Sequence, residues 1–514
     1  MDSPWDQRLG FWWIAEDHPE RPAIVSSPDG ACTYAELAGR AHQLVHLLRS
    51  RGVRPGDTVA ALLPNGTGLV ECSLACSEAG WYFVPLNTFL TGHEIRPILE
   101  HSGARALFTH ERCATQVATV DRGALAAAFA VGDVDGFESL AHARSAHPTS
   151  EPEARTPGSL FVYTSGTTGR PKGIRRPPPH GDPGRVTHDA AVFGRAFDFV
   201  PFGGPHLVST AMYHGGSHSY YSGALNVGHP LVVMPSFDAE ESLRLIEQHR
   251  VFSAYMVPTQ FHRLLQLPDD VRARSDVSSL HAVVHSAAPC PLEVKRRMME
   301  WWGPVIWETY GGMEGPATIA KPHRWLEKPG TVGRAIRGTR LAILDGDGEA
   351  LGAGEIGGIY YGSDAPSFEY VGDEDTTRAA YRGDLFTIGD VGYVDDDGYL
   401  FICDRAKDLI ITGGVNVYPQ EVEAVLATHP AVADVAVIGL PDEEWGESIV
   451  AVVEPVADRV ADDALGDELL EHCRARLAKY KCPRRVEFRA SLPRTDAGKL
   501  SKHQLRDEYA SRGG

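Results

Sequence analysis

The sequence predicts an α/β protein with a large N-terminal domain of sheets and helices and a smaller α+β C-terminal domain. Short, almost continuously apolar segments such as DTVAALLP (57–64) alternate with amphipathic segments of helical spacing. Strands of this kind are typical of parallel sheets that helices cover on both faces. The chain of 514 residues is also long enough, at roughly 100–200 residues per domain, for more than one globular unit.

The first expected helix covers residues 33–52, and short strands follow it along the chain. Its apolar stripe consists of Leu37, Ala41, Leu44, Val45 and Leu48. Gly52 is expected to end this helix. Further strands are predicted at RALFTH (105–110), LVVMP (231–235), FSAYMVP (252–258) and LHAVVHS (280–286). The helical segments between them would be the crossover connections of a parallel sheet.

The pattern changes near residue 404, where we expect the smaller domain to begin. The segment 404–426 predicts a strand, a Gly-Gly turn and a helix that begins at a proline. Val422, Val425 and Leu426 form the apolar stripe of this helix. Two more strands and a helix that presents Leu469, Cys473 and Leu477 on one face follow. We therefore divide the chain into residues 1–404 and 405–514, and the second part is of domain size.

Composition excludes several classes of protein. The net charge of -19 is unsuited to non-specific nucleic-acid binding, which needs a basic surface. No apolar run approaches the ~18 residues of a membrane span, and the N-terminus lacks the pattern of a secretory signal. Of the 8 cysteines only Cys72 and Cys76 are close, at a spacing that suits one helix face. We expect reduced structural thiols and a cytoplasmic protein.

The stretch YTSGTTGRPKG (163–173) is a candidate phosphate-binding loop at the C-terminal end of a predicted strand, where open α/β sheets bind ligands. Its small residues allow backbone N–H groups to approach phosphate oxygens, with hydroxyl donors and a positive charge from Ser165, Thr167, Thr168 and Lys172. It is not a P-loop, because no Ser or Thr follows a Gly-Lys pair. The alternative is a flexible surface turn. The proline-rich stretch 174–186 is expected to be a stiff surface loop.

This loop and further segments in matching order resemble the adenylate-forming superfamily of acyl- and aryl-CoA synthetases, luciferases and peptide-synthetase adenylation domains. The other segments are VPLNTFLTGHEIRPILEHSGARALF (84–108), WETYGGMEG (307–315), YRGDLFTIGDVGYVDDDGYLFICDRAKDLIITGGVNVYPQEVE (381–423) and LPRTDAGKLSK (492–502). The resemblance covers nearly the whole chain and implies a small, mobile C-terminal lid. GGVNVYPQEVE is more similar to CoA ligases than to peptide-synthetase domains.

The resemblance implies an ATP-dependent carboxylic acid–CoA ligase that uses ATP, Mg²⁺ and CoA. A fatty or aromatic carboxylate would attack the α-phosphate of ATP to give an acyl-adenylate and pyrophosphate, and the CoA thiol would then displace AMP. The expected partners are these small molecules alone, with no nucleic acid and no integral membrane association. A monomer or a homodimer is expected.

The resemblance also assigns roles to individual residues. The β- and γ-phosphates would contact Thr164, Ser165, Gly166, Thr167, Thr168, Gly169 and Lys172. The nucleotide would further contact Ser286, Ala287, Ala288, Glu308, Thr309, Tyr310 and Gly311, with Asp390 and Arg405 at the ribose. Glu314 would coordinate Mg²⁺, a cation that prefers oxygen ligands. The lid would supply the catalytic Lys499, the hinge Lys407, and Gly413 and Gly414 at the pantetheine tunnel. His214 would lie beside the acyl group, and Trp307, Gly311 and Gly312 would shape its pocket.

Each assignment has a plainer structural alternative. Glu314 and Lys499 would be solvated, Tyr310 and His214 would belong to the core, Asp390 would stabilise a turn and Arg405 would pair in a linker. Met313 departs from the family, which commonly has threonine before the metal glutamate. Loss of that hydroxyl would weaken nucleotide binding by roughly 1–3 kcal/mol, unless a neighbouring group replaces it or the acid is unusual.

Two other functions compete with CoA ligation. The chain would either load a carrier-protein thiol or activate nitrite or an amine acceptor, or it would be a nucleotide-binding homologue that has lost catalysis. Retention of Glu314, Asp390, Arg405 and Lys499 together argues against the loss of catalysis, because an inactive fold has no need of four such charges in one cleft.

Overall fold

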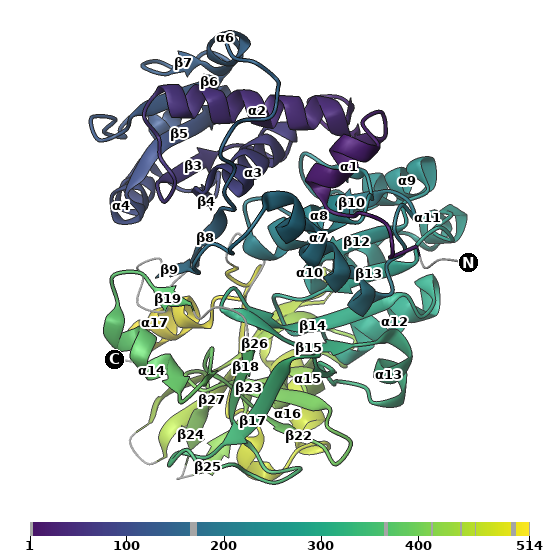
Figure 1. Cartoon of the computed structure of the whole chain (residues 1–514). Coiled ribbons are helices and arrows are strands. Elements are labelled where there is room, and N and C mark those ends of the chain that lie inside the picture. Colours follow the sequence, from purple (N-terminus) through teal and green to yellow (C-terminus); the bar gives the residue numbers. More distant parts are fainter. Residues whose placement is uncertain are drawn as a thin grey trace.

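The computed structural model describes residues 4–164, 172–363, 368–412, 415–442, 445–457, 459–494 and 500–512. Figure 1 shows the N-terminal elements at the top, the middle of the chain beside and below them, and the last third at the bottom. The predicted α/β architecture is confirmed, with sheets and helices throughout. No helix among the described residues is long and apolar enough to cross a bilayer.

The first large sheet contains the strands that were predicted between residues 231 and 286. Its order is β16 (Arg334–Ala335), β15 (Gly315–Ala320), β14 (Ile306–Gly312), β13 (Ala282–His285), β12 (Ser253–Met256), β10 (His206–Val208), β11 (Leu231–Val233), β1 (Pro22–Ser26) and β2 (Cys32–Thr33). The strands from β14 to β1 are parallel, and the ends of the sheet are antiparallel. Parallel order places the carboxyl ends of β12, β13 and β14 at one edge.

The second large sheet carries the candidate phosphate loop. Its order is β19 (Glu369–Tyr370), β9 (Lys172–Arg175), β8 (Ser159–Thr164), β4 (Tyr82–Pro85), β3 (Thr58–Leu62), β5 (Ala104–His110), β6 (Ala127–Val131) and β7 (Glu138–Ser139). The strands from β8 to β7 are parallel, whereas β9 and β19 are antiparallel additions at the edge. Strand β3 is buried along its whole length, as its continuous apolarity predicts.

Helices cover these sheets and connect their strands. They are α1 (Phe11–Asp17), α2 (Tyr34–Ser50), α3 (Thr67–Ala79), α4 (Gly92–Ser102), α5 (Ala114–Val117), α6 (Leu140–Ser145), α7 (Pro183–Val192), α8 (Gly215–Asn226), α9 (Ala239–His249), α10 (Pro258–Leu265), α11 (Asp269–Arg274), α12 (Leu292–Trp302) and α13 (Pro322–Glu327). The predicted helix over 33–52 is α2, which a capping box of Thr33 and Glu36 starts. Its predicted apolar stripe is buried. Cys72 and Cys76 both lie in α3 and are buried, as expected for structural thiols.

The proline-rich stretch 174–186 is shorter as a loop than we predicted. Its first two residues belong to β9, where they pair with β8, and Pro183 already begins α7. Asp182 caps this helix by accepting a hydrogen bond of 3.1 Å from the Arg185 N–H. Proline fits the first turn of a helix, because its missing N–H would have no intrahelical partner there.

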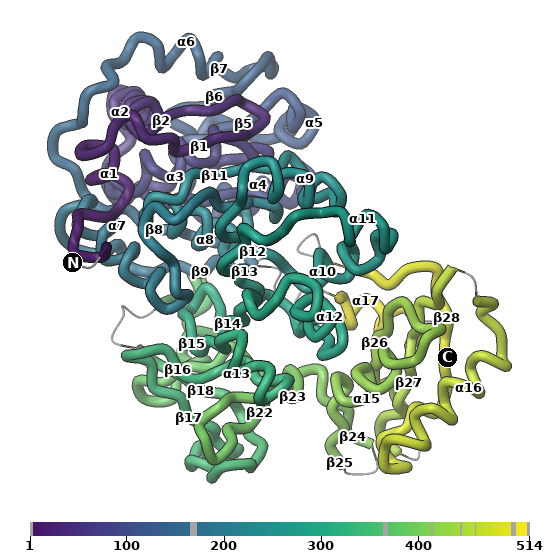
Figure 2. Tube along the Cα trace, turned by 90° about the vertical axis from the view of Figure 1, so that its right-hand side faces the viewer, coloured from purple at the N-terminus to yellow at the C-terminus, as the bar shows by residue number. Residues whose placement is uncertain are grey.

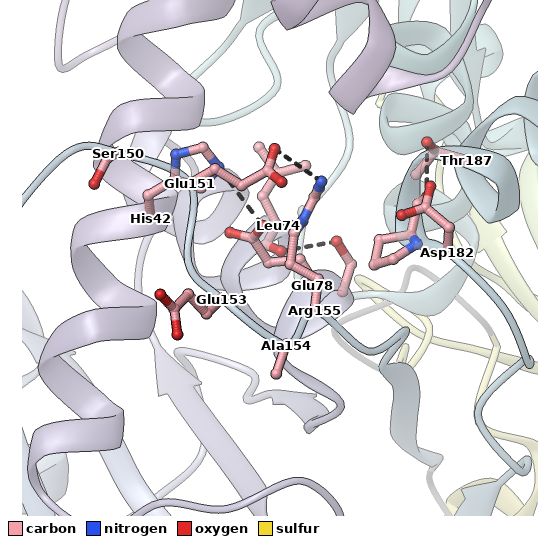
Figure 3. A network of polar contacts seen from close by, with 12 residues as sticks. His42, Leu74, Glu78, Ser150, Glu151, Glu153, Ala154, Arg155, Asp182 and Thr187 are labelled. Carbon is pink, nitrogen blue, oxygen red and sulfur yellow. Dashed lines mark hydrogen bonds and ion pairs between the residues drawn. The ribbon is translucent and has the colours of Figure 1, made fainter.

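A buried polar network fixes the segment that leads into β8 (Figure 3). Arg155 Nε donates to Glu78 Oε2 at 2.9 Å, and its guanidinium lies 4.7 Å from the centroid of the Trp12 ring. His42 Nε2 of α2 lies 3.6 Å from the same Glu78 oxygen. Burial raises the pKa of Glu78 to about 8, although Arg155 opposes this shift. The network joins α2 and α3 to the chain just before the candidate phosphate loop.

An antiparallel sheet follows the two large sheets. It runs in the order β20 (Tyr381–Arg382), β21 (Leu385–Phe386), β18 (Gly357–Ser363), β22 (Asp390–Val394) and β23 (Leu400–Arg405), and β17 (Thr339–Leu344) pairs with β18. Helix α14 (Glu374–Ala380) lies between β19 and β20 in the chain. Strands β22 and β23 therefore carry Asp390 and Arg405 at their facing ends.

The C-terminal elements form a separate small sheet with its own core (Figure 2). The strands are β25 (Val415–Val417), β24 (Ile410–Thr412), β27 (Gly446–Pro455) and β26 (Val432–Asp442), with β28 (Arg485–Phe488) beside β27. The helices are α15 (Pro419–Leu426), α16 (Asp463–Arg474) and α17 (Lys502–Arg512). Leu477 lies beyond α16, contrary to our prediction, but it still packs against the same core. The domain boundary at residue 404, within β23, stays a prediction.

Candidate active site

The motif WETYGGMEG (307–315) covers all but the first residue of β14, the turn that follows and the first residue of β15. Gly311 has a φ of +151°, and a Cβ added there would lie 2.6 Å from the Gly315 carbonyl oxygen. Only glycine fits this close approach of two backbones. The tight turn thereby brings Tyr310 and Glu314, both buried, to one end of the hairpin.

Tyr310, Asp390 and Arg405 come together from three strands. The Tyr310 hydroxyl donates to Asp390 Oδ2 at 2.9 Å, and Arg405 Nε lies 2.9 Å from Asp390 Oδ1. Burial raises the pKa of Tyr310, and the Asp390 charge raises it further, so the hydroxyl stays a donor. Asp390 is buried while the Arg405 side chain is 42% exposed. The arrangement holds an oriented carboxylate behind an accessible cation.

Glu314 and Lys172 both contact Tyr370. The Tyr370 hydroxyl donates to Glu314 Oε1 at 2.8 Å, and Lys172 Nζ lies 5.1 Å from the centroid of the Tyr370 ring. No ion pair joins Glu314 to a cation among the described residues. The site therefore contains a buried carboxylate with a neutral hydrogen-bond donor, beside a lysine.

Two residues at this site were missed by the sequence analysis. Tyr370 gave no signal, because its contact joins strand β19 to Glu314 in the β14–β15 turn, 56 residues away in the chain. Arg176 follows β9 directly, and a Cβ added to Gly315 would lie 3.8 Å from its Nη2 atom. Burial lowers the pKa of Arg176, while the charge of Glu314 is one of the groups that raise it. The Arg-Arg pair next to the phosphate loop was a signal that could have indicated this second cation.

The candidate phosphate loop lies between two strands that pair with each other. Thr164 at the end of β8 faces Lys172 at the start of β9. The predicted Ser165, Gly166, Thr167, Thr168 and Gly169 lie outside the described residues, and so do Gly413, Gly414 and Lys499. The predicted strand before the loop is confirmed as β8, which ends at Thr164.

The segment after β13 has an unusual backbone conformation. Ala287 has a φ of 75°, in the left-handed region that residues with a side chain rarely adopt. The preceding Ser286 is held by Tyr255, whose hydroxyl lies 2.9 Å from Ser286 Oγ. Strained backbone of this kind clusters at ligand sites. Ser286, Ala287 and Ala288 thus leave the carboxyl end of β13 next to β14, which carries Glu308, Thr309 and Tyr310.

The Glu308 side chain forms a buried ion pair. Its Oε2 atom accepts from Lys295 Nζ of α12 at 2.6 Å and lies 3.5 Å from His285 Nε2. Burial raises the pKa of Glu308, but Lys295 and His285 outweigh it and hold the pKa at about 2. The carboxylate of Glu308 is therefore a structural partner of α12.

The helix α8 begins beside the turn of the hairpin. His214 precedes its first residue, and the His214 ring lies 4.5 Å from the Tyr213 ring. A Cβ added to Gly215 would lie 2.3 Å from Met313 Sδ, so Met313 packs on the first turn of α8. Trp307 is buried 6.0 Å from the Phe197 ring, in the core under this helix. At the position where the family commonly has threonine, Met313 thus makes an apolar contact between the hairpin and α8.

Lys407 lies between β23 and β24, where the chain passes to the small sheet. Burial lowers the pKa of Lys407. Arg506 of α17 donates to Asp408 Oδ1 at 2.8 Å and to the Lys407 carbonyl oxygen at 3.5 Å. The last helix therefore contacts the connecting segment directly.

Comparison with known proteins settles the family. Residues 11–370 match the family described as AMP-binding enzyme, and residues 421–499 match the AMP-binding enzyme C-terminal domain. The chain belongs to the AMP-binding enzyme family. The resemblance to adenylate-forming enzymes is thereby confirmed.

Relatives in this family cover the chain almost completely. A feruloyl-CoA synthase from an Amycolatopsis species is 36% identical over 98% of this chain and 99% of its own length. The long-chain-fatty-acid–CoA ligase FadD13 of Mycobacterium tuberculosis (strain ATCC 25618 / H37Rv) is 33% identical over 95% of each chain. The structure of the anthranilate CoA ligase AuaEII in complex with anthranoyl-AMP superimposes with a TM-score of 0.86 at 25% identity, over 100% of both chains. These matches also confirm the fold of a large N-terminal and a small C-terminal domain.

Proposed function

We propose that the chain is an ATP-dependent carboxylic acid–CoA ligase that accepts a fatty or aromatic acid. A carboxylate oxygen attacks the α-phosphorus of ATP, and the bond to the β-phosphate breaks to release pyrophosphate. The CoA thiol loses its proton to solvent. The thiolate then attacks the acyl carbon, and the bond between this carbon and the AMP oxygen breaks. The observation that carries this proposal is the convergence of Glu314, Lys172 and the Asp390–Arg405 pair on the β14–β15 hairpin and its neighbours.

The Asp390 cluster suits the ribose of ATP. Its carboxylate is oriented by Tyr310 on one oxygen and by Arg405 on the other. A buried carboxylate held in this way can accept hydrogen bonds from sugar hydroxyls with little reorganisation. The exposed Arg405 guanidinium would contact the same sugar. Ser286, Ala287 and Ala288, with the backbone of β14 from Glu308 to Gly311, would line the adenine.

Glu314 suits a Mg²⁺ ion that arrives with ATP. Mg²⁺ is usually held by one or two carboxylates together with substrate phosphates and water. The described residues contain no group of three or more potential metal ligands, so an all-protein cage is not built here. A single buried carboxylate with a neutral partner fits the substrate-borne ion. When bound, the ion would neutralise phosphate charge.

The phosphates would be held by the loop 164–172 and by Arg176. Met313 packs on α8 and has no hydroxyl, so it cannot supply the donor to the phosphate that the family commonly provides. The Arg176 guanidinium beside Gly315 is the neighbouring group that we propose in its place. Lys499 on the lid would neutralise charge between the carboxylate and the α-phosphate once Lys407 allows the lid to close.

ATP–pyrophosphate exchange tests this proposal. The panel contains aliphatic and aromatic carboxylates and nitrite, with wild type and Lys499→Ala side by side. We expect exchange with one class of carboxylate and a loss of at least about a hundredfold in the variant. Exchange with none of them despite ATP binding would contradict acid activation and favour a homologue without catalysis.

The acceptor is tested separately with the acid that supports exchange. CoA, a phosphopantetheinylated carrier protein and an amine are offered in parallel, and the product is identified by mass. We expect the CoA thioester. Turnover with the carrier protein or the amine alone would keep the adenylation half of the proposal and overturn the CoA half.

A further inference from the structure

Tyr370 contacts two charged groups that the proposed function needs. Its hydroxyl donates to Glu314 Oε1 at 2.8 Å, and the face of its ring lies 5.1 Å from Lys172 Nζ. One side chain therefore contacts the candidate metal ligand through its polar end and the candidate phosphate-binding lysine through its ring. Tyr370 belongs neither to the candidate phosphate loop (163–173) nor to the motif 307–315 that contains Glu314.

The backbone of Tyr370 is fixed on both sides. Tyr370 pairs with Ile174 across β19 and β9, and the Val371 N–H donates to the Gly173 carbonyl oxygen at 2.9 Å. On the other side the Tyr370 N–H donates to Thr377 Oγ1 at 3.0 Å. The ring also packs edge-on against Phe368, with centroids 5.2 Å apart. These contacts hold the hydroxyl in place without help from Glu314.

The chemistry of a tyrosine suits this position. A phenol ionises only at about pH 10, so a tyrosine hydroxyl is a neutral hydrogen-bond donor at about pH 7. A neutral donor orients one carboxylate oxygen without cancelling the negative charge, whereas a lysine or arginine would neutralise it. The second oxygen of Glu314 then keeps its full capacity to bind a cation.

We propose that Tyr370 is a positioning residue that orients Glu314 for the Mg²⁺ ion of MgATP and sets Lys172 beside it. This inference rests on the proposed function. It assigns no chemical step to Tyr370, which acts only through the two neighbouring charges.

The test compares ATP affinity with Mg²⁺ and with EDTA, measured by titration calorimetry on the full chain. Tyr370→Phe keeps the ring under Lys172 and removes only the hydroxyl. We expect its ATP affinity in EDTA to equal that of wild type, while the enhancement by Mg²⁺ falls by about tenfold. A merely structural role would weaken both affinities equally.

Tyr381→Phe is the matched control. Tyr381 belongs to the same segment, and its hydroxyl bonds the backbone of Phe368 at 3.1 Å. Its loss should leave the Mg²⁺ enhancement unchanged. Thermal unfolding of all variants is recorded in parallel, so that a folding defect is recognised.

Glu314→Gln tests the proposed metal role of Glu314 separately from the positioning role of Tyr370. If this variant keeps the Mg²⁺ enhancement, the proposed metal role of Glu314 is wrong and the inference falls with it. If Glu314→Gln removes the enhancement but Tyr370→Phe does not change it, only the inference is overturned. In the Glu314→Gln background Tyr370→Phe should have no further effect on the enhancement, and an additive loss would contradict positioning through Glu314.

Discussion

The β14–β15 hairpin carries two glutamates with the same burial and opposite surroundings. Glu308 and Glu314 are each 8% exposed, but Glu308 accepts from Lys295 at 2.6 Å whereas Glu314 accepts from the neutral Tyr370 at 2.8 Å. The first carboxylate is neutralised inside the core. The second lies at the end of the hairpin, where its donor is the neutral Tyr370 hydroxyl. Burial and membership of the motif do not distinguish these two carboxylates, whereas the charge of the partner does. We propose on this ground that Glu314 is the functional one.

The largest effect is expected when the ion pair between Lys295 and Glu308 is broken. Lys295→Met leaves a buried carboxylate without its main cation and should lower the free energy of unfolding by about 3–5 kcal/mol. Urea denaturation measures this change. The control is Lys295→Met/Glu308→Leu, which should recover most of the loss because an apolar pair replaces the ion pair. A cost below about 1 kcal/mol for the single variant would contradict the structural role.

The second effect is the dependence of stability on pH. Lys295 and His285 hold the pKa of Glu308 at about 2 in the folded protein, below its ordinary value of 4.5. Because the folded pKa is lowered, the stabilisation is fully present above pH 4.5 and is lost as the pH falls towards 2. The size of this stabilisation is about 3 kcal/mol. Denaturation at several acidic pH values should show a shallower loss in Lys295→Met/Glu308→Leu than in wild type, and equal slopes would refute the assignment.

The smallest effect is expected at Asp390, in the cluster with Tyr310 and Arg405. Tyr310→Phe removes the donor to Asp390 Oδ2 but leaves the contact with Arg405. The free energy of unfolding should fall by about 1 kcal/mol, because water can reach the open side of the cluster. ATP affinity should fall several-fold in the same variant, as calorimetry would show. Unchanged ATP affinity would contradict the proposed contact of Asp390 with the ribose of ATP.

The sequence predicted much of the fold because burial imposes periodicity on the residues. Helix α2 with its stripe from Leu37 to Leu48 and the buried strand β3 follow directly from local patterns. Strand β19 and helix α14 were not predicted, since short segments at a sheet edge carry little pattern. Leu477 was placed in a helix that ends before it, because helix ends are weakly encoded.

The candidate site could be predicted only as far as the motifs reach. The resemblance selected Tyr310, Glu314, Asp390 and Arg405, and the structure brings Tyr310, Asp390 and Arg405 into one cluster. It also selected Glu308, whose side chain turns to Lys295 on another element. The partners that decide the role of each glutamate, Lys295 and Tyr370, are contributed by α12 and β19. Such pairs depend on tertiary packing, which no local pattern encodes.

The most direct test of the central claim is Mg²⁺-dependent ATP–pyrophosphate exchange by Glu314→Gln, with the free energy of unfolding measured on the same preparation. The substitution keeps an acceptor for the Tyr370 hydroxyl and removes the charge. The account predicts a loss of exchange of about a hundredfold with stability within about 1 kcal/mol of wild type. Unchanged exchange, or a loss that a collapse in stability explains, would contradict the claim that Glu314 is the functional carboxylate of the hairpin.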